Sequence, residues 1–333
     1  MFQLIYESEI QMSLVEIMKY ILMMILVGIL SSCSESTAQP PVENGFTMPR
    51  KAIVLAEQAS ASVVILNAET NVPVWQWNPA EAGFSEEQLK WFVNPSEVKP
   101  VCGGSCVLMT ASGGAVALVR IKDKEILFYG KCGEHPNPHS AEILPDGNIV
   151  AVESRYGQVC LFIRSEDSNT AKAIIAAEVP NAHNAVWSRE HSCLFMTGKA
   201  EDGNLTLYRF DYDATVPALV NRKEICHLAN DKGGHDLYPV YGEANKLWMT
   251  SLNGVYTVDV SDPDAPVCEK CFNILDIKSV SNSPDGIIML KPRESWWADR
   301  LIDETGKTVY LVPETKIYKA RWWLDNSFSY PTE

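Results

Sequence analysis

A short segment that begins with lysine or histidine recurs six times along the chain. The six copies are KPVCGG from Lys99, HSAEIL from His139, HNAVWS from His183, HDLYPV from His235, KSVSNS from Lys278 and KARWWL from Lys319. Successive copies start 40, 44, 52, 43 and 41 residues apart. A period of this length is typical of one four-stranded blade of a β-propeller. The spacing therefore predicts an all-β fold with six blades.

A second apolar segment follows most of these copies and indicates how the ring closes. Its copies are VLMTAS from 107, IVAVES from 149, LFMTGK from 194, LWMTSL from 247, IIMLKP from 287 and, near the start, IVLAEQ from 53. The last first-strand copy, at Lys319, has too little chain after it to complete a blade, whereas residues 52–78 supply three strands without a first one. We therefore expect one C-terminal strand to join three N-terminal strands, which leaves no open edge in the ring. A seven-bladed ring, with irregular structure hidden in the long interval from 183 to 235, remains the alternative.

Residues 18–33, MKYILMMILVGILSSC, have the features of an export signal. Lys19 precedes an apolar run that is too short to span a bilayer comfortably, and the run ends in Leu-Ser-Ser-Cys. This pattern resembles a bacterial lipoprotein signal peptide, whose final cysteine is acylated. We expect residues 1–33 to be the signal peptide with the true start at Met18, Cys33 to carry the lipid, 34–49 to be a flexible tether and 50–333 to be a single propeller domain. The alternatives are an uncleaved signal anchor and a general secretory signal.

The formal net charge of −14 argues against nucleic acid as a partner. Proteins that bind a phosphate backbone gain affinity from a positive surface and the release of counterions. The expected partners are instead the membrane, reached through a lipid at Cys33, and an acidic oligosaccharide or other small anion. We expect a monomeric outer-membrane lipoprotein that faces the periplasm or the cell surface.

Nine cysteines suggest several roles. Four lie in strand-like apolar runs and are expected to be buried thiols, namely Cys106, Cys160, Cys193 and Cys226. Two close pairs have spacings that a zinc site can use, namely Cys102 with Cys106 and Cys268 with Cys271. No further paired ligands share this spacing, so isolated thiols or one local disulfide are the alternatives.

The repeated lysines and histidines point to a binding site. In a propeller the first strand of each blade lines the central channel, and the loops that enter it and leave the second strand meet on one face. The six residues expected around that mouth are Lys99, His139, His183, His235, Lys278 and Lys319. The ends of the second strands add Glu57, Glu153, Arg155, Lys199 and Arg293. Basic groups gathered in an acidic protein favour an anionic ligand, such as a uronate-bearing or sulfated sugar.

Three functions fit this ring of residues. A polysaccharide or oligosaccharide lyase or hydrolase would neutralise the sugar carboxylate with a cation while His139, His183, His235 or Tyr238 moves a proton. A binding protein would use the same groups without chemistry, and a scaffold would use only the rim of the propeller. The three histidines are also candidate ligands for a divalent metal ion, although no motif requires a cofactor. One ring of Trp296-Trp297 and one of Trp322-Trp323 can face a sugar, because neighbouring strand residues point to opposite sides.

Three phrases of the sequence support a family resemblance. PHSAEILPDGNIVAV from 138, AHNAVW from 182 and GGHDLYP from 233 resemble uncharacterised six-bladed propeller lipoproteins of gut Bacteroidetes, a domain-of-unknown-function family, over most of residues 51–325. The resemblance implies the fold and export but no activity. The histidines at the heads of strands are more distantly similar to those of oligogalacturonate lyases and arylsulfotransferases. That likeness would place His139, His183 and His235 at a site without fixing a reaction.

Overall fold

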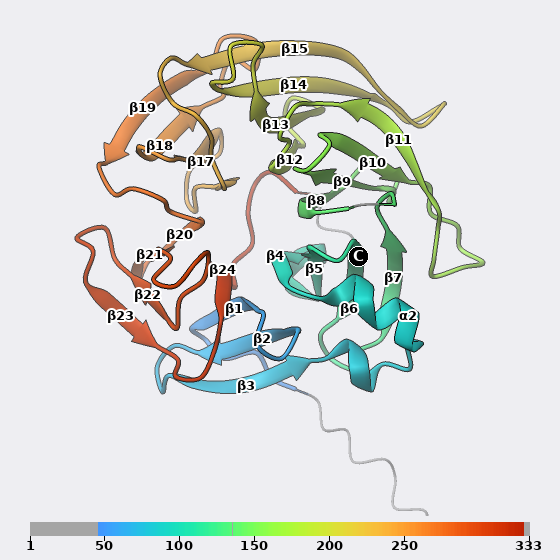
Figure 1. Cartoon of the computed structure of the whole chain (residues 1–333), viewed down its shortest axis with the longest axis vertical. Helices are drawn as coiled ribbons and strands as arrows, with labels where there is room; N and C mark the ends of the chain where they lie inside the picture. The colour runs from blue at the N-terminus through green and yellow to red at the C-terminus, as the bar shows by residue number, and fades with distance from the viewer. Residues whose placement is uncertain (1–45, 135, 330–333) are drawn as a thin grey trace, which may run out of the picture. The chain divides into compact units, whose positions relative to one another are not determined.

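The computed structural model describes residues 46–134 and 136–329. Six four-stranded antiparallel sheets form a ring, which confirms the six-bladed β-propeller (Figure 1). The seven-bladed alternative is wrong, because the long interval from 183 to 235 holds two unusually long strands rather than an extra blade. These strands are β14 (Leu205–Asp213) and β15 (Ala218–Leu228).

Each blade runs from an innermost strand at the channel to an outermost strand at the rim. Blade 1 contains, in this order, β24 (Ile317–Trp322), β1 (Ala52–Glu57), β2 (Ser62–Asn67) and β3 (Val72–Trp77). Blade 2 contains β4 (Pro95–Val101), β5 (Cys106–Ala111), β6 (Ala115–Arg120) and β7 (Ile126–Lys131). Blade 3 contains β8 (Pro138–Ile143), β9 (Ile149–Glu153), β10 (Gln158–Phe162) and β11 (Ala173–Glu178).

The second half of the ring repeats the same order. Blade 4 contains β12 (Asn184–Ser188), β13 (Cys193–Lys199), β14 and β15. Blade 5 contains β16 (Leu237–Pro239), β17 (Lys246–Ser251), β18 (Gly254–Asp259) and β19 (Val267–Phe272). Blade 6 contains β20 (Ser279–Ser283), β21 (Gly286–Leu290), β22 (Arg300–Ile302) and β23 (Thr308–Leu311).

The helical segments are short and belong to blade 2 and the loop before it. They are η1 (Pro79–Glu81), α2 (Glu86–Leu89), η2 (Lys90–Phe92) and η3 (Cys102–Gly104). Ser85 and Gln88 form a capping box that starts α2. Across the residues that the structure describes, no helix is long and apolar enough to cross a membrane.

The ring closes as the sequence predicts. Strand β24 pairs antiparallel with β1, with Trp322 opposite Ile53 and Lys319 opposite Ala56. The innermost strand of blade 1 therefore comes from the far end of the described chain. Its backbone groups pair with those of β1, so β1 is not left as an unpaired edge strand.

The hydrophobic core lies between neighbouring blades. Blades 1 and 2, for example, pack Val54 and Ile65 against Val107 and Met109. The inner strands are buried on both faces, and every residue of β1 and of β5 is buried. This explains why these strands read as continuous apolar runs rather than alternating patterns.

Residues 1–45 lie outside the described part of the chain, and with them the predicted signal peptide and Cys33. Only the last four residues of the predicted tether are described. Among these, Phe46 and Met48 pack against the core between blades 1 and 2, and the ring centroid of Phe46 lies 6.4 Å from that of Trp75.

One disulfide joins two blades. Cys226 of β15 is bonded to Cys268 of β19, so the outermost strands of blades 4 and 5 are linked. The expectations of a thiol at Cys226 and of a local pair at Cys268 are wrong, because the partners are 42 residues apart and meet only in the folded ring. Cys106, Cys160 and Cys193 are buried, as predicted.

The segment after β24 crosses the channel at the end opposite the candidate site. The backbone oxygen of Phe328 accepts a hydrogen bond from the Arg189 nitrogen of blade 4, and the Ser327 hydroxyl donates to the Ala244 oxygen of blade 5. The Phe328 ring is buried in the core between these blades. Figure 1 shows this segment running inside the ring from β24 toward β12. The channel is therefore covered at one end by the chain itself.

Candidate functional site at the channel mouth

The strand registers define one equivalent position in each blade at the channel mouth. In five blades it is the residue directly before, or at the bulge of, the first regular pair of the inner strand. In blade 5 it is the residue before Asp236, whose backbone oxygen accepts a hydrogen bond from the Thr250 nitrogen of the second strand. The six residues are Ser96, His139, His183, His235, Lys278 and Tyr318. Four of the six residues predicted from the sequence lie here, whereas Lys99 and Lys319 lie deeper in the channel.

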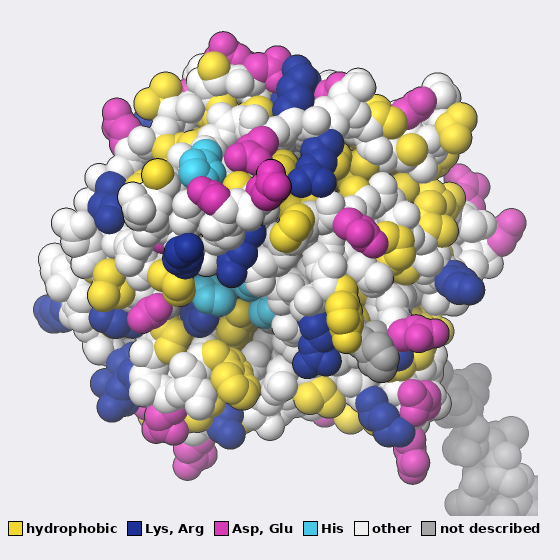
Figure 2. All heavy atoms as spheres, turned by 45° about the horizontal axis from the view of Figure 1, so that its top comes forward, with side chains coloured by type: hydrophobic (Ala, Val, Ile, Leu, Met, Phe, Trp, Pro, Cys, Tyr) yellow, Lys and Arg dark blue, Asp and Glu magenta, His cyan; other side chains and the backbone are white. Residues whose placement is uncertain are grey.

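Five of the mouth residues form a continuous arc of contacts. The rings of His139 and His183 stack with centroids 4.7 Å apart, and His235 meets His183 edge-on at 5.0 Å. At one end of the arc, the Tyr318 hydroxyl lies 3.1 Å from Nδ1 of His139. At the other end, Nζ of Lys278 lies 2.6 Å from Nε2 of His235. On the face shown in Figure 2, histidine side chains reach the surface beside lysine or arginine side chains.

Burial and neighbouring positive groups keep the three imidazoles neutral. Burial lowers the pKa of His183 to about 4, even though the Asn181 oxygen accepts a hydrogen bond from Nδ1 at 2.9 Å. Burial, together with the nearby imidazole of His183, also lowers the pKa of His139 and of His235. At neutral pH the arc therefore presents hydrogen-bonding imidazoles rather than imidazolium cations.

Lys278 supplies the positive charge of the arc. Burial lowers its pKa to about 8, so the ammonium form still dominates at neutral pH. An ammonium group has only donors, so it donates to Nε2 of His235, and the imidazole proton is thereby assigned to Nδ1. That Nδ1 is buried and has no hydrogen-bond partner among the described residues. The site thus holds a buried donor that has no acceptor among the described residues.

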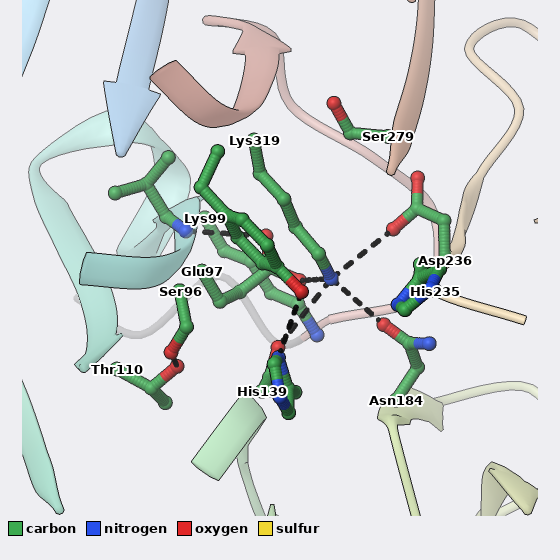
Figure 3. A network of polar contacts seen from close by, with 12 residues as sticks. Ser96, Glu97, Lys99, Thr110, His139, Asn184, His235, Asp236, Ser279 and Lys319 are labelled. Carbon is green, nitrogen blue, oxygen red and sulfur yellow. Dashed lines mark hydrogen bonds and ion pairs between the residues drawn. The ribbon is translucent and has the colours of Figure 1, made fainter. Parts of the chain in front are cut away.

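A balanced set of charges fills the channel below the mouth. Nζ of Lys319 lies 2.9 Å from Glu97 and 3.5 Å from Asp236. Figure 3 draws both contacts as dashed lines. The guanidinium of Arg321 bonds both of these carboxylates, and Lys99 pairs with Glu142 at 3.5 Å. All six groups are at most 3% exposed.

Within the described residues, these three cations therefore face three carboxylates. Burial acts to raise the pKa of Glu97, but Arg321 and Lys319 outweigh it and hold the pKa below its usual value. Burial lowers the pKa of Lys319, against the opposing effect of Glu97 and Asp236. The charges of Lys99 and Lys319 are thus compensated by buried carboxylates, so neither ammonium group is available to a ligand.

The remaining predicted residues fall into two groups. Glu57 and Glu153 are buried and accept hydrogen bonds from backbone N–H groups of the turns that follow them, at 2.7–3.0 Å. Arg155 and Arg293 are exposed, and Lys199 is half-buried. The carboxylates thus shape the loops, while the cations stand around the mouth.

Tyr238 lies deeper than the mouth. It is three residues beyond His235 along the inner chain of blade 5, and the Arg321 guanidinium lies 4.0 Å from its ring centroid. Burial raises its pKa, so the hydroxyl stays protonated at neutral pH and cannot accept a proton as a phenolate. Tyr318, which the sequence analysis did not single out, is the tyrosine that contacts the histidine arc. The feature of the sequence that could have identified Tyr318 is its position directly before Lys319, a polar residue within an apolar strand.

The tryptophan pairs divide between the two faces of the propeller. The loop between β21 and β22 exposes Trp296, and its Nε1 donates to Oε1 of Gln58 at 2.9 Å. Trp297 is partly buried, with Nζ of Lys316 5.1 Å from its ring centroid. Trp322 is buried at the far end of β24 and donates to the Gly286 oxygen. Only the first pair therefore presents an exposed ring near the mouth.

The described residues contain no group of three or more His, Cys, Asp or Glu side chains arranged to hold a metal ion. For His139 and His183 the physical reason is visible in the stack, because two imidazoles that overlap face to face do not aim their nitrogens at a common point.

The fold and the mouth define a six-bladed β-propeller with a polar channel that is covered at one end and lined by histidines at the other. The chain belongs to a family of unknown function, DUF6528, whose sequence pattern matches residues 12–333. A comparison with curated proteins finds no match.

Solved structures share the fold at low sequence identity. A functionally unknown protein from Desulfotomaculum acetoxidans is 13% identical, with 78% of each chain covered and a TM-score of 0.51. A protein of unknown function from Bacteroides caccae is 11% identical over 83% of this chain and 99% of the other, with a TM-score of 0.52. A chain of a nidogen/laminin complex is 11% identical over 82% and 98%, with a TM-score of 0.56. At these identities the likeness concerns the fold alone.

Proposed function

We propose that this propeller binds an anionic carbohydrate, a uronate-bearing or sulfated sugar, at its channel mouth. The observation that carries the proposal is the contrast between Lys278 and the cations below it. Lys319, Arg321 and Lys99 each have a carboxylate partner in the channel, whereas Lys278 forms no ion pair with any described residue. Its nearest acidic influence is the exposed Asp276.

The neighbours of Lys278 support an anion as its missing partner. A carboxylate or sulfate beside the ammonium would compensate its charge in a partly dry site, where such contacts are strong. Neutral imidazoles cost less to bury than charged ones, so the arc can be held ready without a ligand.

A sugar fits the surroundings better than a bare ion. Trp296 is 49% exposed on a loop that leaves a second strand on the same face, and its flat apolar ring can cover the carbon-bound hydrogens of a sugar ring. Arg155 and Lys199 stand on other second-strand ends of this face. These groups offer an oligosaccharide contacts beyond the arc.

Titration with monosaccharides tests the binding proposal. We expect the domain to bind glucuronate or galacturonate but not the neutral sugars of the same stereochemistry. Lys278→Met should weaken uronate binding about tenfold or more, because a hydrogen bond to a charged group contributes roughly 1.5–3 kcal/mol. Lys122→Met, at an exposed lysine of the β6–β7 hairpin in blade 2, is the control and should bind like the wild type. Equal affinity of the Lys278→Met and wild-type proteins would refute the site, and no response to any sugar would favour the scaffold function.

Catalysis on the same ligand is the second candidate function, and the contact between Tyr318 and His139 favours it. An imidazole with a lowered pKa, oriented by a hydroxyl on Nδ1, can move a proton through Nε2. A lyase and a hydrolase both create a new reducing end, but only a lyase leaves an unsaturated uronate at the new non-reducing end, so analysing the products of an incubated oligouronate for the double bond separates the two. Loss of turnover in His139→Gln with retained binding is the expected result for an enzyme.

The predicted export signal indicates where in the cell this function would be carried out. We propose that Cys33 is acylated and holds the domain at the outer membrane, facing the periplasm or the cell surface. The support is the sequence from Met18 to Cys33 alone. Cys33→Ser should move the protein from the membrane fraction to the soluble fraction, and an unchanged distribution would contradict the anchor.

A further inference from the structure

A second basic cavity lies beside the mouth, between blades 5 and 6. Its volume is about 310 Å³, which is the lower end of the range for small-ligand sites. Lys291, Arg293 and Arg300 line it together with the apolar side chains of Ile274 and Ile302. Cationic groups over an apolar floor are a combination that suits an acidic sugar residue.

The cavity carries more positive than negative charge. Asp299 is the carboxylate that pairs with its cations, at 2.8 Å from Nε of Arg300 and 3.4 Å from Nη1 of Arg293. Glu294 is exposed on the same loop, and its backbone is paired with Trp297. Lys291 forms no ion pair with a described residue. One carboxylate therefore orients two guanidinium groups and leaves the ammonium group uncompensated.

The cavity and the arc are neighbours along one sheet. The backbone nitrogen of Lys278 donates to the oxygen of Leu290 at 2.8 Å, so Lys291 begins directly beside the head of the inner strand. Adjacent strands lie about 4.8 Å apart. The loop that starts at Lys291 also carries Trp296. An extended ligand at Lys278 thus has the cavity beside it along blade 6.

We propose that this cavity is a second anion subsite and that the ligand is an oligosaccharide with acidic groups on at least two of its sugar residues. One acidic group lies at Lys278 and another at Lys291, Arg293 and Arg300. The inference rests on the proposed function and narrows its ligand from any anionic sugar to an oligoanion. When one oligosaccharide occupies both subsites, binding of its second acidic group becomes an intramolecular step, which raises the overall affinity without a new type of contact.

Chain-length dependence of binding tests the inference. Galacturonate and trigalacturonate are titrated into the wild type, Lys291→Gln/Arg293→Gln, Lys278→Met and the control Lys122→Gln, at an exposed lysine of blade 2 outside the cavity lining. The wild type should bind the trimer at least tenfold more tightly than the monomer. The double variant should lose about tenfold in trimer affinity and keep the monomer affinity, since each partly exposed charge contributes modestly. Its trimer binding should also depend less steeply on salt.

The outcomes separate the two proposals. A double variant that binds the trimer like the wild type, or that loses monomer and trimer affinity equally, overturns the second subsite while Lys278→Met still tests the first. A wild type that binds neither compound overturns the proposed function and the inference with it. A sulfated trisaccharide of equal charge, titrated in parallel, distinguishes sulfate from carboxylate as the bound group. Thermal melting of each variant checks that the exposed substitutions leave the fold intact.

Discussion

Replacing Lys319 by methionine tests whether the charges in the channel stabilise the fold only as a balanced set. Methionine keeps most of the length and volume of the lysine side chain but removes the ammonium. Nζ of Lys319 contacts Glu97 at 2.9 Å, Asn184 at 3.0 Å and Asp236 at 3.5 Å, and the side chain is fully buried. The variant leaves two carboxylates facing the single charge of Arg321.

The size of the effect follows from this geometry. Breaking a buried ion pair by removing one partner costs about 3–5 kcal/mol, because an uncompensated charge stays in a dry site. An unfolding entropy of about 2.1 cal/mol/K per residue, over roughly 280 residues, converts this loss into a melting temperature lower by roughly 5–9 °C. Calorimetry and urea denaturation measure both quantities.

A second substitution provides the control. Lys319→Met/Glu97→Gln removes one charge of each sign and restores the balance, so it should be more stable than Lys319→Met alone. Glu87 and Lys90 form an exposed pair at 2.8 Å, and the corresponding Lys90→Met should leave the melting temperature almost unchanged. If the losses of Lys319→Met and Glu97→Gln simply add in the double variant, or if Lys319→Met melts like the wild type, the reasoning is refuted.

Two further predictions concern stability. Burial lowers the pKa of His183 to about 4, whereas in the unfolded chain this imidazole takes up a proton below about pH 6.5. The contribution of neutral His183 to the free energy of unfolding is therefore complete above pH 6.5. It falls by about 3 kcal/mol on acidification to pH 4. Urea denaturation at both pH values should show a smaller loss for His183→Gln than for the wild type, and equal losses would contradict the shift. Cys226→Ser/Cys268→Ser should lower the free energy of unfolding by about 4 kcal/mol, since the bond closes a loop between residues 42 apart. A wild-type protein whose stability is insensitive to a reducing agent would show that the bond is absent.

The fold was predictable because each blade repeats one pattern at a nearly constant interval. The closing strand followed from counting, since three strands near residue 52 lacked a first strand and one strand near residue 319 lacked companions. The disulfide was not predictable, because neither Cys226 nor Cys268 carries a local sign of its partner. Their meeting depends on the packing of two outer strands.

The site was predictable only in part, because the inner strands contain bulges. The register shifts between Ala56 and Glu57 opposite β24, so Tyr318 occupies the mouth and Lys319 the first position below it. Lys99 lies three residues beyond its mouth position, which Ser96 fills. An alignment of the blades on their basic residues therefore combined residues of the mouth with Lys99 and Lys319, which lie deeper in the channel. A better guide was the polar residue that follows every mouth position, such as Asp236 after His235.

The closing strand β24 affects when the protein can fold during its synthesis. Strand β24 carries Lys319 and Arg321, and it also completes the backbone pairing of β1. A chain that stops before Ile317 would leave Glu97 and Asp236 without these counter-charges and β1 with an open edge at the same time. The ring can therefore close only after translation has passed Trp322, and products that stop before Ile317 would carry two independent defects that favour aggregation or proteolysis.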